Sequence, residues 1–462
     1  MTSATPGGVR GSSMADPRHL VSIDDLSLAE IRALFEHARA FAADPRAFAH
    51  LCPGLISASL FYEPSTRTRL SFESAMLRLG GGVLTAADMK STSASKGESL
   101  ADTVRVVGGA YADVIVLRHA SEGAARLAAQ YSPIPVVNAG DGSHEHPTQT
   151  LCDLYNLWEE RGRIDGIHVV LAGDLRYSRT IHSFVYALAR FGANIVCTPQ
   201  PGFELPAYVM QRLREEFGVE PVRADTSRLG ELAEACDAMY LTPQKPHQLS
   251  LFTDASKGLA VERVDALYMT RPQTERFTDK DLPIAKYQQL GPRQMKAASL
   301  KDAVVMHPLP RRDEIQPELD ADPRSIYFKQ AARGVPIRMA ILAFLLGRID
   351  LKTPARTGEE RFYTQRMGEN PCTNPTCISR TETRHVKPLF RLASRFPVRA
   401  YCGFCSQELQ APVVGSANSG LFFERESVEA RKIRPEHLVL CHSEAHALAQ
   451  GFRRGAVESR AR

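Results

Sequence analysis

The sequence predicts an α/β protein with two parallel-sheet α/β domains and a small β-rich module towards the C-terminus. Short apolar runs alternate with helical stretches along most of the chain, which is typical of buried parallel strands joined by helices. A length of 462 residues is too great for one typical domain and suggests about three. Four clustered cysteines mark a separate module beyond residue 371.

The composition excludes several classes of protein. The net charge of +5 is small, and no dense Lys/Arg stripe with interleaved aromatics points to nucleic acid. No apolar run approaches the length of a membrane span. Residues 1–18 are rich in Gly, Ser, Thr and Pro and lack the apolar core of a secretory signal, so we expect a disordered leader. The clustered cysteines without such a signal favour a reducing cytoplasm.

The predicted elements follow one another in a regular order. A capping box at Ser27 and Glu30 predicts the start of the first helix. The apolar run 55–61 predicts a buried strand that leads into a second helix. The further predicted strands are short apolar runs separated by helical stretches, and they cover 112–117, 134–138, 169–174, 193–197, 237–242 and 265–270. The last two runs are nearly identical, which predicts two similar strands of one sheet.

The start of the second helix is the most informative part of the chain. Pro64 suits a helix entry, and Ser65 and Thr66 supply capping hydroxyls. Four apolar residues then recur on one helical face, and the glycines at 80–82 end the helix. The first turn therefore presents free N–H groups, hydroxyls and the Arg67 guanidinium, a combination that suits a phosphate dianion. The alternative interpretation is an ordinary capped helix with surface arginines.

Residues 61–72, Phe-Tyr-Glu-Pro-Ser-Thr-Arg-Thr-Arg-Leu-Ser-Phe, resemble the carbamoyl-phosphate signature of the aspartate and ornithine carbamoyltransferases. Other segments resemble family blocks in the family's order, namely Lys-Gly-Glu at 96–98, His-Pro-Thr-Gln at 146–149, Gly-Asp at 173–174, Thr-Arg-Pro-Gln at 270–273 and His-Pro-Leu-Pro at 307–310. The resemblance covers residues 19–350. It implies the family's fold and its transfer of a carbamoyl group.

The resemblance also implies a role for each matching residue. The implied catalytic residues, which polarise the carbonyl or stabilise developing charge, are Arg67, Thr68, Arg118 and His146. The implied substrate-binding residues are Ser65, Thr66, Thr92, Lys96, Gln149, Arg179, Arg271, Gln273, Pro308 and Leu309. No covalent nucleophile is needed, and no carboxylate is poised as a general base. The departing phosphate can therefore take the proton of the attacking amine.

The same residues favour L-aspartate over ornithine as the amine substrate. In the aspartate-specific enzymes Arg179 and Arg271, with Gln273 in support, would clamp two carboxylates, because planar guanidinium forks match carboxylates. Position 308 is Pro, where ornithine carbamoyltransferases usually carry Cys. The implied products are N-carbamoyl-L-aspartate and phosphate, in de novo pyrimidine biosynthesis.

The small, polar stretch 90–100 predicts a flexible loop. The resemblance implies that Thr92 and Lys96 reach from this loop into the site of a neighbouring subunit. It therefore implies a homotrimer with shared active sites, which can pair into a larger assembly. A solvated loop without a role in binding is the alternative interpretation.

Cys372 and Cys377, followed by Cys402 and Cys405, have the spacing of a tetrahedral zinc site. A disulfide framework is the weaker alternative in a cytoplasmic chain. Residues 374–379, Asn-Pro-Thr-Cys-Ile-Ser, resemble the zinc-binding half of the aspartate carbamoyltransferase regulatory chain. This resemblance implies a structural Zn²⁺ and no organic cofactor. The stretch before it is too short for the nucleotide-binding half of that chain.

Composition shifts and family blocks predict how the chain divides. The expected parts are a leader at 1–18, a carbamoyl-phosphate domain at 19–147 completed by 334–350, an aspartate domain at 148–333, a linker at 351–371, a zinc domain at 372–425 and a tail of unknown role at 426–462.

Two alternative functions stay open. One is carbamoyl transfer to another amine, because an insertion at 241–264 lies next to the expected Arg271 clamp. The other is a non-catalytic zinc-bearing scaffold or nucleic-acid ribbon, since arginines and lysines occur between the two cysteine pairs.

Overall fold

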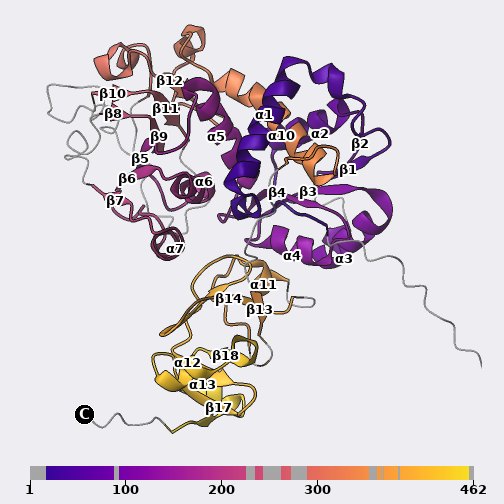
Figure 1. The fold of residues 1–462 in the computed structure, drawn as a ribbon, viewed down its shortest axis with the longest axis vertical. Coiled ribbons are helices and arrows are strands. Elements are labelled where there is room, and N and C mark those ends of the chain that lie inside the picture. Colours follow the sequence, from indigo (N-terminus) through magenta and orange to yellow (C-terminus); the bar gives the residue numbers. More distant parts are fainter. Residues whose placement is uncertain are drawn as a thin grey trace, which may run out of the picture.

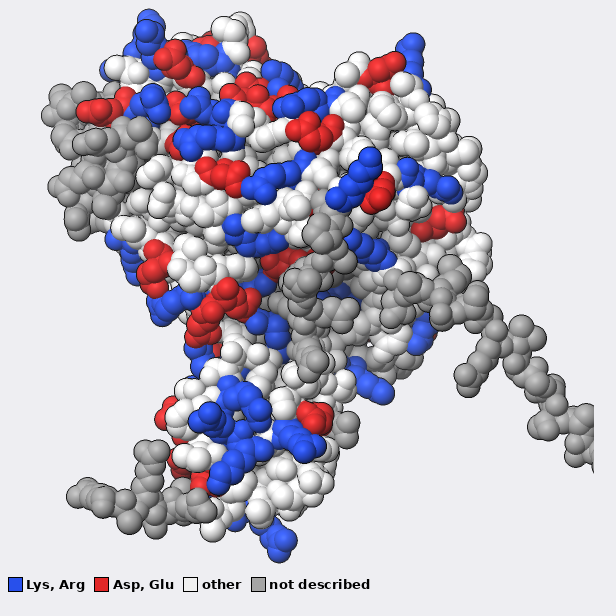
Figure 2. Space-filling model, in the orientation of Figure 1, with Lys and Arg blue, Asp and Glu red and all other residues white. Residues whose placement is uncertain are grey.

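A computed structural model of the chain describes residues 17–87, 93–224, 235–242, 262–271, 289–352, 362–365, 367, 369–382 and 386–456. Two α/β domains lie beside each other, and a smaller module, coloured orange to yellow, lies below them (Figure 1). Lys and Arg side chains gather on the face of this module that Figure 2 shows. The expected leader at 1–18 lies outside these residues except for its last two. None of the helices in the described ranges is long and apolar enough to cross a membrane.

The first domain is built on a four-stranded parallel sheet in the order β2-β1-β3-β4. Its strands are β1 (Ile56–Phe61), β2 (Gly82–Ala86), β3 (Val114–His119) and β4 (Val136–Asp141). Its helices are α1 (Leu28–Ala43), α2 (Thr66–Arg78), α3 (Leu100–Val106), α4 (Ala124–Tyr131) and, from much later in the chain, α10 (Tyr327–Leu345). Nearly every residue of β1, β3 and β4 is buried, as expected for a parallel sheet covered on both faces.

The second domain has a six-stranded parallel sheet in the order β12-β11-β9-β5-β6-β7. Its strands are β5 (His168–Gly173), β6 (Asn194–Pro199), β7 (Val222–Arg223), β9 (Ala238–Thr242), β11 (Ala266–Met269) and β12 (Val304–Met306). Its helices are α5 (Pro147–Arg161), α6 (Arg179–Arg190) and α7 (Ala207–Phe217), and a short ribbon pairs β8 (Ala235–Cys236) with β10 (Arg263–Val264).

The two similar sequence runs form neighbouring strands, as predicted. β9 and β11 pair in parallel with Tyr240 opposite Tyr268, and the two rings stack with their centroids 4.0 Å apart. The fold class, with two parallel-sheet domains and a β-rich module, is thereby confirmed. Most of the insertion expected at 241–264 lies outside the described residues.

Helix α2 begins where its sequence predicts but is capped differently. Its apolar face is buried, and Gly80 follows it with φ +87°, where a Cβ atom would lie 1.8 Å from the Ala49 carbonyl oxygen. Ser65 is the N-cap residue, but its side chain makes no capping hydrogen bond, so the expected cap is wrong. The Ser65 hydroxyl is consequently available to a ligand at the helix start.

Helices α5 and α10 connect the two domains. α10 packs against α1, α2 and α5, and α5 also packs against β4 and α6. The border expected between residues 147 and 148 falls at the first turn of α5, and the border expected between 333 and 334 falls inside α10. Each helix therefore belongs to the contact between the domains.

The C-terminal module contains two antiparallel sheets. The first has the order β13-β14-β15, with β13 (Phe362–Thr364), β14 (Leu389–Arg395) and β15 (Val398–Cys402). The second has the order β18-β16-β17-β19, with β16 (Val413–Ser416), β17 (Leu421–Glu424), β18 (Leu438–Cys441) and the parallel edge strand β19 (Arg453–Arg454). The short helices are α11 (Ile378–Thr381), α12 (Val428–Lys432) and α13 (Glu444–Ala449).

The border expected at residue 425 therefore cuts through the second sheet. β18 and β19 come from the expected tail, and Val439 of β18 and Phe452, which precedes β19, are buried in the small core of that sheet. The expected linker likewise ends early, because β13 already pairs with β14.

The module docks onto the first domain over a shared apolar core, and the buried residue Glu122 lies within this contact. Ion pairs also join the module to α7 of the second domain. Glu122 accepts hydrogen bonds from Asn374 Nδ2 at 2.8 Å and Thr376 Oγ1 at 3.1 Å. Its backbone N–H donates to the Thr376 carbonyl, and its carbonyl accepts from the Ile378 N–H. Side-chain and main-chain bonds therefore fix this contact together.

Candidate active site and metal centre

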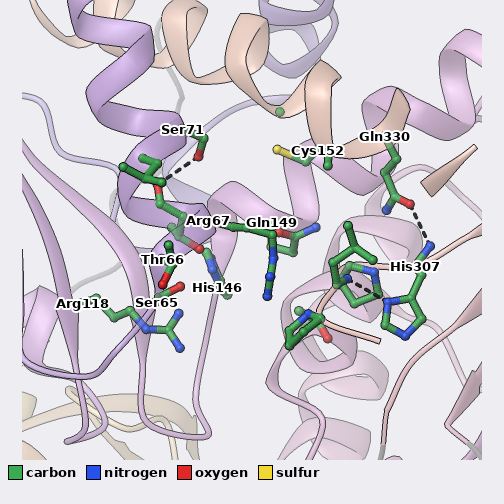
Figure 3. A pocket seen from close by; sticks show the side chains of 18 of the residues that line it. Ser65, Thr66, Arg67, Ser71, Arg118, His146, Gln149, Cys152, His307 and Gln330 are labelled. Atoms are coloured by element: carbon green, nitrogen blue, oxygen red, sulfur yellow. Dashed lines mark hydrogen bonds between the residues drawn. The ribbon is translucent and has the colours of Figure 1, made fainter. Parts of the chain in front are cut away.

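A cavity of about 730 Å³ lies between the first and the second domain (Figure 3). One wall comes from the start of α2 and the ends of β1 and β3, and the other comes from the residues after β11 and β12. The starts of α5 and α6 and part of α10 complete it. Carboxyl ends of parallel strands are the usual place for ligands in such sheets.

The first wall is an anion-binding surface. Ser65, Thr66, Arg67 and Thr68 line it at the N-terminus of α2, where backbone N–H groups have no partner within the helix. Burial and the like charge of Arg271 on the opposite wall lower the pKa of Arg67. Arg67 stays protonated, so both walls of the cavity present a positive charge that a phosphate or carboxylate would neutralise.

Arg118 and His146 extend this wall towards the centre of the cavity. Arg118 follows the apolar part of β3, and its Nη1 donates to the Ala139 carbonyl at 3.1 Å while its Nη2 lies 3.4 Å from Glu63 Oε2. His146 is the N-cap residue of α5, and its backbone N–H donates to Ser183 Oγ at 2.9 Å. Both side chains are almost fully buried, which holds their donors in fixed positions.

The second wall carries Arg271, Pro308 and Leu309, and Gln149 lies between the walls on α5. Leu309 has φ +54°, a left-handed conformation that is uncommon for a residue with a side chain. The backbone N–H of Leu309 donates to His307 Nδ1 at 2.8 Å. Residues in such conformations persist where their surroundings hold them, often at functional sites.

A buried histidine–carboxylate pair supports this turn. His307 Nε2 lies 2.6 Å from Glu314 Oε1. Burial lowers the pKa of His307, and although burial also raises that of Glu314, the hydrogen bond from His307 holds the pKa of the carboxyl low. Because Nδ1 accepts from Leu309, neutral His307 carries its proton on Nε2 and donates it to the Glu314 carboxylate.

The cavity brings together ten of the predicted site residues from distant parts of the chain. They are Ser65, Thr66, Arg67, Thr68, Arg118, His146, Gln149, Arg271, Pro308 and Leu309. Lys96 lies on the 3₁₀ turn η4 (Ser93–Lys96), is exposed and does not line this cavity.

Three predicted residues have no described side chain. Thr92 and Gln273 lie outside the described residues, and Arg179 is placed only by its backbone, at the first position of α6. Its neighbours Ser178 and Thr180 line the cavity.

Glu63, Glu314 and Gln330 were not predicted as site residues, although Glu63 pairs with Arg118 and Gln330 lines the cavity. Glu63 stands beside Pro64 in the phosphate segment, which was the available signal. Glu314 and Gln330 carry no motif, because they reach the site only through the fold.

The four predicted metal ligands form one buried cluster. The Sγ atoms of Cys372, Cys377, Cys402 and Cys405 all lie within 4.8 Å of one another, with 3.6 Å between Cys372 and Cys405. A tetrahedral zinc with Zn–S bonds of about 2.3 Å separates its sulfurs by about 3.8 Å. The residues present therefore fit a zinc ion.

Comparisons with known proteins agree with two α/β domains followed by a cysteine-containing module. Residues 18–159 match the carbamoyl-P binding domain of aspartate/ornithine carbamoyltransferases, and residues 165–345 match their Asp/Orn binding domain. Residues 371–414 match the metal binding domain of the aspartate carbamoyltransferase regulatory chain. The predicted fusion of a catalytic region with this module is confirmed.

Relatives and solved structures cover the catalytic region. The aspartate carbamoyltransferase catalytic subunit of Thermoplasma acidophilum is 43% identical over 72% of this chain and 100% of that subunit. The catalytic subunit of M. jannaschii aspartate transcarbamoylase superposes with a TM-score of 0.57 at 41% identity, covering 71% of this chain and 98% of that one.

The aspartate transcarbamoylase of Trypanosoma cruzi, solved with N-(phosphonacetyl)-L-aspartic acid, gives a TM-score of 0.57 at 33% identity, over 72% of this chain and 99% of that one. Two domain matches, full-length relatives and a cavity between the domains converge on one assignment. The chain belongs to the aspartate/ornithine carbamoyltransferase family and carries a C-terminal domain like that of the regulatory chain.

Proposed function

We propose that this chain is an aspartate carbamoyltransferase, which converts carbamoyl phosphate and L-aspartate into N-carbamoyl-L-aspartate and phosphate. The observation that carries the proposal is the convergence of Arg67, Arg118 and Arg271 on one cavity at the N-terminus of α2. Both substrates are anions, and this arrangement gathers positive charge for both. The relatives bear the same activity in their names.

The chain's own residues suffice to describe the reaction. The amine of aspartate attacks the carbamoyl carbon, a C–N bond forms, and charge builds on the carbonyl oxygen, which Thr68, Arg118 and His146 would stabilise. The C–O bond to phosphate then breaks, and the leaving phosphate takes the proton released by the amine. The start of α2, with Arg67, would hold that phosphate. The remaining catalysis is positioning of the two substrates.

Selection of aspartate would rest on the second wall. Arg271 faces the cavity, and Arg179 begins the helix beside it. Two guanidinium groups on separate elements suit a dicarboxylate such as aspartate. Gln273 would support Arg271.

We infer that the working form is a homotrimer with shared sites. The proposed role of Lys96 is to complete the phosphate site of a neighbouring subunit, together with Thr92. Two observations support this: Lys96 is exposed and does not line its own cavity, and two large apolar side chains, Leu77 on α2 and Leu84 on β2, are 59% and 46% exposed. Exposed apolar surface of this kind is available for contact with a neighbouring subunit.

The cysteine cluster would hold one structural Zn²⁺, which closes the fold of the module without taking part in the chemistry. We place the enzyme in pyrimidine biosynthesis and in the cytoplasm, where free thiols persist; all nine cysteines of the chain are unpaired.

A carbamoyl-transfer assay on the purified full chain tests the function. We expect N-carbamoyl-L-aspartate to form from carbamoyl phosphate and L-aspartate, and no product from L-ornithine. Product from another amine would favour the first alternative, and no turnover of any amine would favour a scaffold. Particle mass measured on the same sample tests the trimer.

A further inference from the structure

A buried carboxylate, Asp153, lies directly behind the wall of the cavity. It stands one turn after Gln149 on α5, and its side chain is 0% exposed. Its Oδ1 accepts hydrogen bonds from Gln149 Nε2 at 2.9 Å, Tyr268 OH at 2.9 Å and Gln330 Nε2 at 3.2 Å. All three partners are neutral groups, so these contacts do not pair the carboxylate with a positive charge.

The acceptor at Oδ1 dictates how both glutamines are turned. A side-chain amide has one donor end and one acceptor end, so an NH₂ held by Asp153 sends the amide oxygen the other way. For Gln330 the result is visible, because its Oε1 accepts the backbone N–H of His307 at 2.8 Å (Figure 3). For Gln149, which lines the cavity, the amide oxygen is the end left for a ligand.

We propose that Asp153 is a positioning residue that makes the cavity selective for the NH₂ of the carbamoyl group. Through Gln149 it presents a hydrogen-bond acceptor to that NH₂. Through Gln330 and His307 it holds the backbone that precedes Pro308, whose carbonyl is a second acceptor. The inference rests on the proposed function. It adds that the NH₂ group is the feature by which the cavity distinguishes carbamoyl phosphate from an acyl phosphate that lacks an NH₂.

The surroundings of Asp153 suit such a fixed role. Its partners come from α5, from β11 and from α10, so one atom links three elements that meet at the cavity. Tyr268 is itself held by stacking on Tyr240. The nearly identical strand sequences around these two tyrosines, which the proposed chemistry leaves without a function, thus supply the support behind the carboxylate.

Acetyl phosphate is the probe, because it carries a methyl group where carbamoyl phosphate carries NH₂. Its inhibition constant and the KM for carbamoyl phosphate are to be measured on full-length wild type, Asp153→Ala and Asp153→Asn. For Asp153→Ala we expect kcat/KM for carbamoyl phosphate to fall about 10- to 100-fold, the usual cost of a misplaced binding group. The inhibition constant of acetyl phosphate should change less than about twofold, since that ligand makes no NH₂ contact.

Asp153→Asn is the conservative variant. Its side-chain oxygen can still accept from Gln149 and Gln330, so it should recover most of the lost kcat/KM. Asp237→Ala is the matched control: it removes another buried carboxylate, which binds the His168 N–H at 2.9 Å ahead of β9. We expect it to lower the melting temperature without changing the preference for carbamoyl phosphate over acetyl phosphate.

A double-mutant cycle with Gln149→Leu separates positioning from general damage. If Asp153 acts through Gln149, adding Asp153→Ala to Gln149→Leu should cost much less than it costs in the wild type. Two results would overturn the inference: Asp153→Ala weakens the binding of carbamoyl phosphate and acetyl phosphate equally, or its effect adds fully to that of Gln149→Leu. In either case an active wild type would leave the proposed function standing. A wild type without carbamoyl transfer would overturn both.

Discussion

The cavity and the cysteine cluster pose opposite electrostatic problems. In the cavity, cationic side chains face one another, and burial together with the charge of Arg271 lowers the pKa of Arg67. In the cluster, four thiols that are at most 3% exposed crowd within 4.8 Å. Each group of like residues therefore needs a ligand of opposite charge: an anion in the cavity and a metal cation in the cluster. The difference is access: the cavity is open to exchange substrates, whereas the buried thiols suit an ion that stays.

The largest effect is expected from removing the zinc ion proposed for the cysteine cluster. Structural zinc contributes about 10–16 kcal/mol of binding free energy, so a chelator should unfold the module. Hydrogen exchange should show loss of protection in β14 and β15 and recovery when Zn²⁺ is returned. Cys377→Ser should abolish zinc binding, whereas Cys441→Ser, which removes a buried thiol outside the cluster, should not. Unchanged protection after zinc extraction would contradict the comparison.

The next effect concerns the donors in the cavity. Arg118→Ala or His146→Ala should lower kcat about 100- to 1000-fold, or about 3–4 kcal/mol, because each would remove the donor proposed for the carbonyl oxygen. Steady-state kinetics at saturating substrates measure this. Arg105→Ala on α3, where the arginine is 49% exposed, is the control and should leave kcat unchanged. A wild-type kcat in the two cavity variants would mean that the cavity is not the reaction site.

A smaller and more selective effect is expected on the second wall. Arg271→Ala removes one charge-assisted contact to aspartate, worth about 1.5–3 kcal/mol, and should raise the KM for aspartate about 10- to 100-fold. The dissociation constant of carbamoyl phosphate, measured by calorimetry, should change much less. An equal loss of affinity for both substrates would show that the second wall is not specific to aspartate.

The last effect concerns stability rather than activity, and it takes the form of a pH dependence. Burial raises the pKa of Asp153 from 3.8 to about 7, although its hydrogen bonds lower it, so the folded chain binds this proton more tightly than the unfolded chain does. The contribution of Asp153 to stability should therefore fall as the pH rises from about 4 to about 7, by at most about 1.4 kcal/mol per pH unit. Asp153→Asn should lack this component in denaturant titrations. A difference between the two proteins that does not vary with pH would contradict it.

The sequence predicts best what is local. The start of α2 could be located from Pro64 and the polar residues after it, because helix entry depends on neighbours in the chain. The cap predicted at Ser65 is wrong, because the same hydroxyl can serve the helix or a ligand and the sequence does not distinguish the two. The four cysteines were recognisable because metal ligands keep short spacings.

What the sequence left out depends on long-range packing. Asp153, Glu314 and Gln330 are ordinary helix or loop residues until β11, β12 and α10 meet. The second sheet of the module also escaped prediction, because its strands are only two to four residues long and carry no motif. Residue roles carried over from the family blocks, such as that of Lys96, remain predictions.

The hydrogen bonds between Glu122 and residues 374–378 belong to a contact that has a consequence for assembly. A module of the kind named for a separate regulatory chain is here covalently tethered to the catalytic region that it touches. Its contact is then governed by a fixed effective concentration rather than by how much protein is present. Dilution that would dissociate a separate subunit should therefore leave this module in contact with the catalytic region.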